Sequence, residues 1–227
     1  MIDGRRVLGI VPARAGSVRL PGKNVRLLGG RPLIAVTLDV CAGSTILDHL
    51  LVSTDDEAVM ALARDRDIAV VRRPPEIADA SASVVDAVAH ALAASGEVWD
   101  YVVLLQPTSP FRTAADIDAA VDLCHRADAP AVISVSAMPK PRAFYGRIGD
   151  DGVFLVDGPD APERVVINGA VYVIRPEILM RERSFQPAGT LAYAMPSQRS
   201  WDIDTPEDFA ICEALWSLPV NPLARPE

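Results

Sequence analysis

Lysine is nearly absent from this 227-residue chain, because only Lys23 and Lys140 stand among its 22 basic residues. Cysteine and histidine are scarce as well, with three of each, and no two cysteines lie close together in the sequence. This spacing argues against a disulfide framework and against a zinc site. Buried free thiols in a cytoplasmic protein are the simpler interpretation.

Long hydrophobic runs are also missing, so no segment reaches the roughly 18 residues that a membrane helix needs. The first residues lack a signal-peptide pattern, which again favours the cytoplasm. A net charge of −8 and an aromatic content of 5% argue against a nucleic-acid-binding protein, which needs a basic face or an aromatic platform. Net charge does not prevent a single cleft from gathering cations. With 50% hydrophobic residues the chain can form a full core.

Short apolar runs alternate with amphipathic segments over the first 136 residues. This alternation predicts an α/β fold with a mainly parallel sheet between two helical layers, and such sheets bind ligands at the carboxyl ends of their strands. The predicted strands cover residues 7–11, 50–53, 68–71, 101–105 and 132–135. The predicted helices cover residues 33–41, 56–64 with Asp55 as cap, 83–94, and 114–125 with Thr113 as cap.

The alternation stops after residue 136. Two apolar runs, 144–148 and 153–156, flank Gly149-Asp150-Asp151-Gly152, which predicts a β-hairpin. We therefore expect one domain, residues 1–227, with a small excursion over residues 138–168. Strands are expected again at 170–174 and 191–195, followed by a final helix with Thr205 at its cap.

The segment after the first strand is rich in glycine and in cations. It contains Gly16 and Gly22 together with Arg14, Arg19 and Lys23. Backbone N–H groups and positive charge at the end of a strand suit a polyphosphate, and a basic surface loop is the alternative. The segment is not a P-loop, because five residues separate Gly16 from Gly22-Lys23, Asn24 follows the lysine, and no helix is expected there.

Two carboxylates stand two residues apart near the end of the chain, at Asp202 and Asp204. Residues at this spacing in an extended segment face the same way, so the pair could hold Mg²⁺. Taken alone, the pair is better explained by a solvated Asp202 and an Asp204 that supports the cap of the next helix. The presence of a phosphate-binding segment favours the metal.

Two further segments carry polar groups beside predicted strands. Residues 104–113, LLQPTSPFRT, offer Gln106, Thr108 and Ser109, and residues 166–172 contain Asn168-Gly169. In isolation the first is equally a rigid connector, and the second is more simply a turn.

Together these segments resemble the cytidylyltransferases that activate acidic sugars, most of all the acylneuraminate cytidylyltransferase (CMP-sialic acid synthetase) family. The matching segments appear in the family's order, from residue 11 to residue 209. They are VPARAGSVRLPGKN, VSTDD, RRPPEIADASAS, LLQPTSPFRT, NGAVY and DIDTPEDF. The resemblance implies a Rossmann-like three-layer α/β/α nucleotidyltransferase fold, Mg²⁺ as cofactor, CTP as substrate, and a homodimer built through the hairpin excursion.

The resemblance also assigns roles to residues of this sequence. It implies that Arg14, Lys23, Asp202 and Asp204 are catalytic and that Asp202 and Asp204 hold the metal. The residues expected to bind the nucleotide are Ala13, Arg14, Ala15, Gly16, Ser17, Arg19, Lys23, Asn24, Arg73, Ala82 and Ser83. The residues expected on the acceptor side are Gln106, Thr108, Ser109, Asn168 and Gly169.

The chain departs from the family pattern at two positions. Val18 stands where the family usually has lysine, so either Arg19 compensates or a phosphate contact is lost. Val166 stands where the sialic-acid enzymes usually have an arginine that holds the sugar carboxylate, which leaves Lys140, Arg142 or Arg164 as candidates for the acceptor anion. The acceptor is thus expected to be a nonulosonic acid, with 3-deoxy-octulosonic acid (KDO) or a small phosphonate as alternatives, and a CTP-binding relative without turnover is a further alternative.

Overall fold

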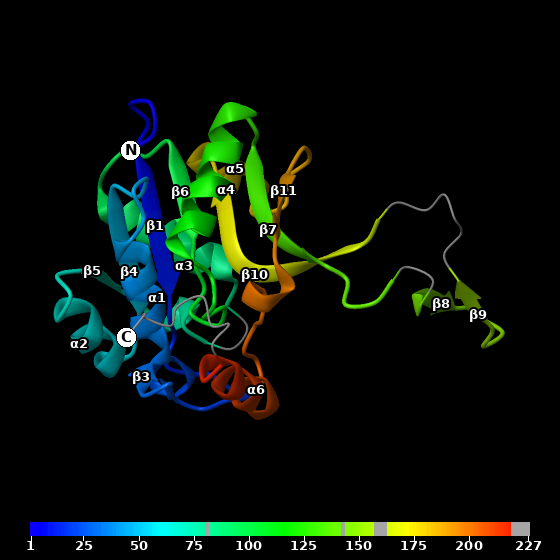
Figure 1. Ribbon diagram of the computed structural model, residues 1–227. Coiled ribbons are helices and arrows are strands. Elements are labelled where there is room, and N and C mark those ends of the chain that lie inside the picture. Colours follow the sequence, from blue (N-terminus) through cyan, green and yellow to red (C-terminus); the bar gives the residue numbers. More distant parts are fainter. Residues whose placement is uncertain (80–81, 142–143, 157–162, 219–227) are drawn as a thin grey trace.

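A seven-stranded sheet forms the centre of the molecule in the computed structural model, which describes residues 1–79, 82–141, 144–156 and 163–218 (Figure 1). The strand order is β11-β7-β10-β6-β1-β4-β5. The strands are β1 (Val7–Pro12), β4 (His49–Thr54), β5 (Ala69–Arg72), β6 (Tyr101–Leu104), β7 (Ala131–Ala137), β10 (Val165–Ile174) and β11 (Leu191–Met195). All neighbouring pairs are parallel except those of β10, which is antiparallel to β6 and β7. The predicted α/β class is confirmed.

Helices cover both faces of the sheet, which gives the three layers expected of a Rossmann-like fold. The helices are α1 (Leu33–Ala42), α2 (Glu57–Arg64), α3 (Val84–Ser95), α4 (Ala114–Arg126), α5 (Pro176–Glu182) and α6 (Pro206–Trp216). One core cluster joins α1, α2 and α4 to the sheet, and a second joins α3 and α5 to the opposite face.

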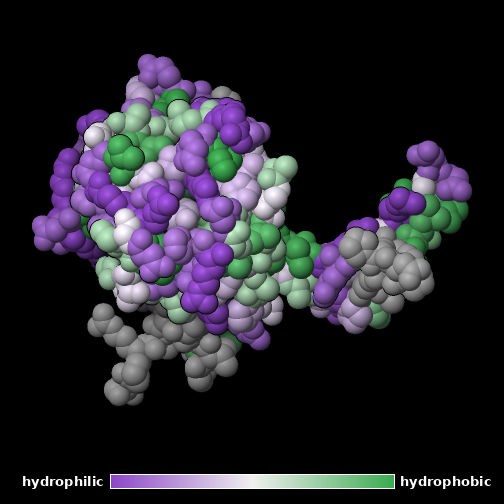
Figure 2. All heavy atoms as spheres, turned by 90° about the horizontal axis from the view of Figure 1, so that it is seen from above, coloured by the Kyte–Doolittle hydropathy of each residue, from purple (hydrophilic) through white to green (hydrophobic). Residues whose placement is uncertain are grey.

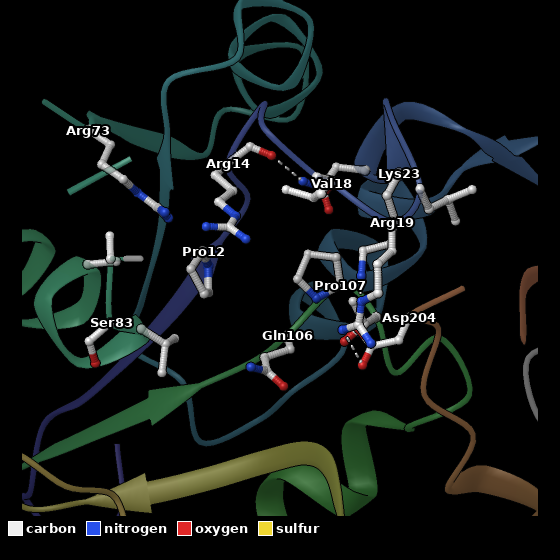
Figure 3. Close-up of a pocket in the computed structure, with 17 residues that line it drawn as sticks. Pro12, Arg14, Val18, Arg19, Lys23, Arg73, Ser83, Gln106, Pro107 and Asp204 are labelled. Carbon is white, nitrogen blue, oxygen red and sulfur yellow. Dashed lines mark hydrogen bonds and ion pairs between the residues drawn. The ribbon is translucent and has the colours of Figure 1, made fainter. Parts of the chain in front are cut away.

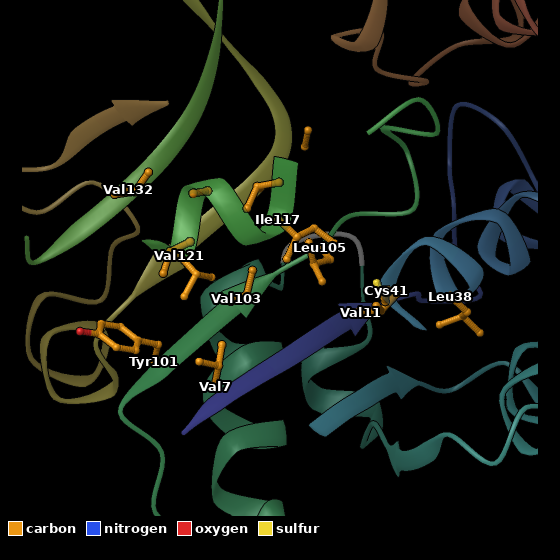
Figure 4. Packing of buried hydrophobic residues seen from close by; sticks show 14 of the residues in the cluster. Val7, Val11, Leu38, Cys41, Tyr101, Val103, Leu105, Ile117, Val121 and Val132 are labelled. Atoms are coloured by element: carbon orange, nitrogen blue, oxygen red, sulfur yellow. The ribbon is translucent and has the colours of Figure 1, made fainter. Parts of the chain in front are cut away.

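The alternation of side chains along β1 explains why the sheet needs cover on both faces. Val7 and Val11 belong to the first cluster, while Leu8 and Ile10 belong to the second. All four side chains are fully buried. Figure 4 shows Val7 and Val11 in the first cluster with Val103 of β6, across from side chains of α4 such as Ile117. A continuous apolar run is therefore what a strand buried on both faces requires.

Local capping signals set the starts of several helices. Thr113 and Thr205 form capping boxes with Asp116 and Asp208, as their spacing predicts. One cap was assigned wrongly from the sequence. Asp56, and not Asp55, accepts hydrogen bonds from the first turn of α2. Asp55 instead accepts a bond from the backbone N–H of Ala15, so it supports the glycine-rich loop.

The strand β10 is longer than predicted and contains Asn168-Gly169 within it. Its register with β7 shifts between Ile167 and Tyr172, and Gly169 has a φ of +73°. A left-handed backbone at this point is the conformation that glycine adopts at least cost. The pair therefore makes an irregularity inside a strand, where the sequence suggested a turn before one.

The hairpin excursion stands away from the sheet as an arm (Figure 1). Strands β8 (Gly146–Ile148) and β9 (Phe154–Val156) pair antiparallel, which confirms the predicted hairpin. Within the excursion, residues 142–143 and 157–162 lie outside the described part of the chain, and Arg142 is one of them. The hairpin carries apolar side chains on its surface, including Ile148 and Phe154 (Figure 2).

A small hairpin of β2 (Leu27–Leu28) and β3 (Arg31–Pro32) follows the glycine-rich loop, and α6 packs beside it. Gly29, in its turn, has a φ of +56°, and a Cβ there would lie 1.9 Å from Nε1 of Trp216. Helix α6 is thereby held next to the segment that carries Lys23, which begins a 3-10 turn over Lys23–Val25. No described helix is both long and apolar enough to cross a membrane.

Candidate functional site

A cleft of about 310 Å³ opens beyond the carboxyl ends of β6, β1 and β5, the edge at which such sheets bind ligands (Figure 3). Four cations line it against a single carboxylate. The charged lining residues are Arg14, Arg19, Lys23, Arg73 and Asp204. In an acidic protein of net charge −8, this cleft concentrates positive charge, as a highly charged anion requires.

Hydrogen bonds from the end of β4 and from the turn Lys23–Val25 fix the first part of the glycine-rich loop. Thr54 donates its hydroxyl to the carbonyl of Ala13 at 2.5 Å, and the amide of Asn24 donates to the carbonyl of Arg14 at 3.0 Å. The buried side chain of Leu20 anchors the far part of the loop in a third apolar cluster. The loop is thus shaped by the body of the fold, with its cations directed into the cleft.

One end of the cleft is formed by Arg73, Arg14 and Ser83 (Figure 3). The guanidinium of Arg73 is buried and donates to the carbonyl oxygen of Ser53 at 2.9 Å. Burial lowers the pKa of Arg73, and the nearby Arg14 adds to this effect against the opposing influence of Asp55. Arg14 donates to the carbonyl of Asp79 at 2.5 Å. Two fixed guanidinium groups therefore stand close together at this end.

The other end of the cleft holds a charged cluster of Arg19, Lys23 and Asp204 (Figure 3). Arg19 Nη2 lies 2.9 Å from one carboxylate oxygen of Asp204, and Lys23 Nζ lies 3.4 Å from the other. Lys23 also donates to the carbonyl of Ile203 at 2.7 Å. Lys23 therefore ties the glycine-rich loop to the Asp-x-Asp segment, across 180 residues of sequence.

The Asp-x-Asp segment is anchored by the residue between its two carboxylates. Ile203 is fully buried between Asp202 and Asp204, and its N–H donates to the carbonyl of Thr108 at 2.8 Å. Partial loss of hydration raises the pKa of Asp202, and the Asp204 carboxylate adds to the rise against an opposing hydrogen bond from Thr108. Asp202 and Asp204 thus influence each other's charge.

The carboxylates of Asp202 and Asp204 fit the way in which proteins usually hold Mg²⁺ beside phosphates. Among the residues that the structure describes, no group of three or more His, Cys, Asp and Glu side chains forms a metal cage. Mg²⁺ is commonly bound by one or two carboxylates, with substrate phosphates and waters completing its shell. Asp202 and Asp204, next to a cationic cleft, supply that kind of partial set.

The predicted acceptor-side residues meet around Gly169. A Cβ built on Gly169 would lie 3.1 Å from Oε1 of Gln106, 3.4 Å from Oγ of Ser109 and 3.7 Å from Oδ1 of Asp202. The absence of a side chain at Gly169 therefore lets Gln106 and Asp202 approach the same spot. This contact joins the segment after β6, the irregularity of β10 and the Asp-x-Asp segment.

The side chain of Asn168 is bonded within the protein. Its carbonyl accepts from the Ser134 hydroxyl at 2.6 Å, and its NH₂ group donates to the Ser200 hydroxyl at 2.9 Å and to the sulfur of Met195 at 3.4 Å. Ser109 donates to the backbone carbonyl of Asn168 at 3.2 Å. In this arrangement Asn168 holds β7, β10 and the segment before Asp202 together, and its acceptor role stays a prediction.

Most of the residues proposed from the sequence line the cleft directly. These are Arg14, Ser17, Arg19, Lys23, Asn24, Arg73, Ala82, Ser83, Gln106, Thr108 and Asp204. The others do not line it: five belong to the same segments as lining residues, and Asn168 and Gly169 lie in β10. They are Ala13, Ala15, Gly16, Ser109, Asn168, Gly169 and Asp202. Lys140 and Arg164 line a separate cavity at the base of the arm.

Sequence reasoning missed two groups that support the site. Arg112 is fully buried and donates to the carbonyl of Ala170 and to the hydroxyl of Thr37, both at 2.8 Å. Burial lowers its pKa to about 10. The second group is an ion pair between Arg199 and the fully buried Asp116. The position of Arg112 directly after the apolar Phe111 was a signal that could have indicated a buried arginine. No such signal existed for Arg199, because its partner Asp116 lies 83 residues away in sequence.

Comparisons with known proteins agree with this geometry. The family model described as "Cytidylyltransferase" matches residues 8–144. The chain belongs to the cytidylyltransferase family. It is 33% identical to the CMP-N,N'-diacetyllegionaminic acid synthase of Legionella pneumophila, over 94% of this chain and 97% of that protein. The resemblance found in the sequence motifs is confirmed.

Other similar proteins differ from this chain in length or in sequence. The N-acylneuraminate cytidylyltransferase of Streptococcus agalactiae is 34% identical over 88% of this chain, which spans only 51% of that protein. A CTP-complexed structure of CMP:2-keto-3-deoxy-manno-octonic acid synthetase has a TM-score of 0.71 at 16% identity, covering 92% of this chain and 98% of that one. This likeness confirms the nucleotidyltransferase fold.

Proposed function

We propose that this chain transfers CMP from CTP to an acidic sugar of the nonulosonic class and releases pyrophosphate. The observation that carries the proposal is that Lys23 contacts the Asp-x-Asp segment inside one cationic cleft. The legionaminic and neuraminic relatives support the acceptor class. KDO is the alternative acceptor that the structural neighbour suggests.

The proposed reaction is attack of an acceptor hydroxyl oxygen on the α-phosphorus of CTP. A new P–O bond forms to the acceptor, the bond to the β-phosphate breaks, and the hydroxyl proton is lost to solvent or a base. The protein must align the two substrates and neutralise the charge that grows on the phosphates. Arg14, Arg19 and Lys23 would contact the phosphates, and Gln106 would orient the acceptor beside Gly169.

Mg²⁺ is the proposed cofactor, held by Asp202 and Asp204. When bound, the ion would polarise the phosphate oxygens and favour departure of pyrophosphate. The residues Arg73, Ala82 and Ser83, at the opposite end of the cleft, would then bind the nucleoside. This placement follows from the separation of the two ends of the cleft (Figure 3).

A homodimer and a cytoplasmic location complete the proposal. The arm exposes the apolar side chains of Ile148 and Phe154, which a second copy of the chain would cover. All three cysteines are buried and free, which supports a reducing compartment.

The direct test is pyrophosphate release from CTP, ATP, GTP and UTP, with neuraminic acid, legionaminic acid, KDO, a small phosphonate and no acid. We expect release with CTP and a nonulosonic acid only. Release only with KDO or only with the phosphonate would show that the acceptor belongs to that class and is not a nonulosonic acid. Binding of CTP without release for any acid would mean that the chain is a nucleotide-binding protein without turnover.

A matched pair of variants tests the metal carboxylates. Asp202→Asn keeps the size of the side chain and removes its charge, so we expect turnover to fall on the order of 10²-fold. Asp150→Asn makes the same change in the turn of the distant hairpin and should leave turnover unchanged. Equal rates for the two variants would remove Asp202 from the mechanism.

A further inference from the structure

Asp204 has both carboxylate oxygens engaged by cations of the glycine-rich loop. Oδ2 faces Arg19 at 2.9 Å, and Oδ1 faces Lys23 at 3.4 Å. A divalent cation held by Asp204 would need one of these oxygens, and cation and guanidinium repel each other at such distances. Metal binding at Asp204 is therefore favoured when one of the two side chains gives way.

Arg19 is the side chain that can move. It is 65% exposed, whereas Lys23 is 13% exposed and is also held by the carbonyl of Ile203. Ion pairs as exposed as Arg19–Asp204 contribute little free energy, so exchange of partners costs little. The loop that carries Arg19 has Gly22 in the left-handed region at a φ of +66° and only Leu20 buried beside it.

An alternative partner for Arg19 lies within the same cleft. Arg19 lines the cleft together with Arg14 and Lys23, the other residues proposed to contact the phosphates. A triphosphate carries more charge than one carboxylate and offers paired oxygens that match the fork of a guanidinium. Val18, next to it, is apolar and 73% exposed, so it offers no charge to the phosphates. Arg19 would supply the positive charge that a lysine at position 18 gives other members of the family.

We infer that Arg19 exchanges partners during binding: it neutralises Asp204 in the empty cleft and moves to the nucleotide phosphates, which frees Asp204 for the divalent cation. This inference rests on the proposed function and adds that the binding of nucleotide and the binding of metal are coupled through Arg19. Because each ligand removes an obstacle to the other, nucleotide and metal favour each other's binding, and the coupling is reciprocal. A cleft without nucleotide holds the metal weakly, since Arg19 competes for Asp204.

The test is the pair of variants Arg19→Gln and Arg181→Gln. Both remove one positive charge, but Arg181 lies on α5 and pairs with the adjacent Glu182, outside the cleft. Mn²⁺ binding is measured by electron paramagnetic resonance without nucleotide, and CTP binding is measured by calorimetry in EDTA. We expect Arg19→Gln to bind Mn²⁺ about two- to fivefold more tightly, the range for one exposed ion pair, and CTP about tenfold more weakly. Arg181→Gln should change neither.

The opposite signs of the two shifts distinguish exchange from a simpler role. If Arg19→Gln weakens CTP binding and leaves Mn²⁺ binding unchanged, Arg19 is a phosphate ligand that does not compete with the metal, and the inference is wrong. If Mn²⁺ binding tightens and CTP binding is unchanged, Arg19 does not reach the phosphates, and the inference is again wrong. Arg19→Lys keeps the charge and should restore much of both affinities.

Failure of the proposed function has a different signature. In that case the unaltered protein itself would bind neither CTP nor Mn²⁺ in the cleft, or would bind both and release no pyrophosphate. The exchange would be overturned alone if the unaltered protein turns over and the Arg19→Gln variant shows neither shift.

Discussion

Val18 is the residue at which this cleft most clearly departs from its family's pattern. Its side chain lines the cleft and is 73% exposed, so it packs little apolar surface. Arg19, the next residue in the sequence, and Lys23 both face Asp204. The rim therefore has room for a further cation without disturbing the core.

We expect Val18→Lys to strengthen CTP binding several-fold, because it adds one charge beside the phosphates without removing a packed side chain. Calorimetry with CTP gives the affinity. Val98→Lys is the matched control, since Val98 is 84% exposed and lies outside the cleft. Equal affinities for the two variants would mean that position 18 does not face the phosphates.

At the scale of elements, one ion pair joins α4 to the segment that precedes Asp202. Arg199, at the end of the turn η4 (Ser197–Arg199), donates to both carboxylate oxygens of Asp116, at 2.7 and 3.0 Å. Asp116 is fully buried and also completes the cap at Thr113. The pair thus connects the start of α4, which follows the 104–113 segment, with the Asp-x-Asp segment.

Arg199→Gln would leave the buried carboxylate of Asp116 without its cation. We expect the free energy of unfolding to fall by about 3 kcal/mol, measured by urea denaturation at neutral pH. The double variant Asp116→Asn with Arg199→Gln should lose less, because no unpaired charge remains. If the double variant loses as much free energy of unfolding as the single variant, the pair stabilises the fold through its shape and not through its charge.

The same pair predicts a pH dependence. Burial alone would raise the pKa of Asp116, but hydrogen bonds from Arg199 and Thr113 outweigh it, and the pKa is lowered. Since the folded pKa lies below the unfolded one, the stabilisation is present above about pH 4 and is lost as pH falls further. In the Asp116→Asn variant, the free energy of unfolding should depend less on pH below about pH 4. If the dependence is unchanged, other carboxylates cause it.

Elements set by local residues were predictable from the sequence. The caps at Thr113 and Thr205 depend on side chains three residues apart, and both were predicted. Helix α5 was missed because it is short and buries only Leu179. The antiparallel direction of β10 was missed because a continuous apolar run looks the same in either direction, and its pairing is decided by β6 and β7.

The candidate site shows the same division. Residue type and spacing placed Lys23 and Asp204 at this sheet edge, and both line the cleft, while their roles stay predictions. The internal bonding of Asn168 was not, because its amide partners Ser134 and Ser200 come from elements far away in sequence. Spacing indicates which groups lie at the sheet edge, whereas long-range packing decides which of them remain free for a ligand.

The whole molecule combines a net negative charge with a cationic cleft at the edge of its sheet. The chain has 30 acidic residues against 22 basic ones, yet four of those 22 line the cleft. An overall negative charge repels polyanions in general, while the local field at the sheet edge attracts a small one. The scarcity of lysine therefore does not weaken anion binding, because arginine supplies three of the four cations in the cleft.

The arm is the other feature of the whole molecule, and it predicts the assembly state. Ile148 is 79% and Phe154 is 57% exposed, on paired positions of β8 and β9. A two-stranded hairpin is marginally stable alone, and covering its apolar side chains against a second copy would stabilise it. We expect a light-scattering mass near twice the 24.3 kDa of one chain.

The pair of substitutions Ile148→Asp and Phe154→Asp should convert that dimer to a monomer, because each places a charge on the surface that the partner covers. Arg147→Gln alters the neighbouring position of β8 and should leave the dimer intact. The melting temperature of the body should change little in either case, since the arm stands away from the sheet (Figure 1). A monomeric unaltered protein at micromolar concentration would refute assembly through the arm. A dimer that persists with both aspartates in place would assign the interface to another face of the sheet and its helices.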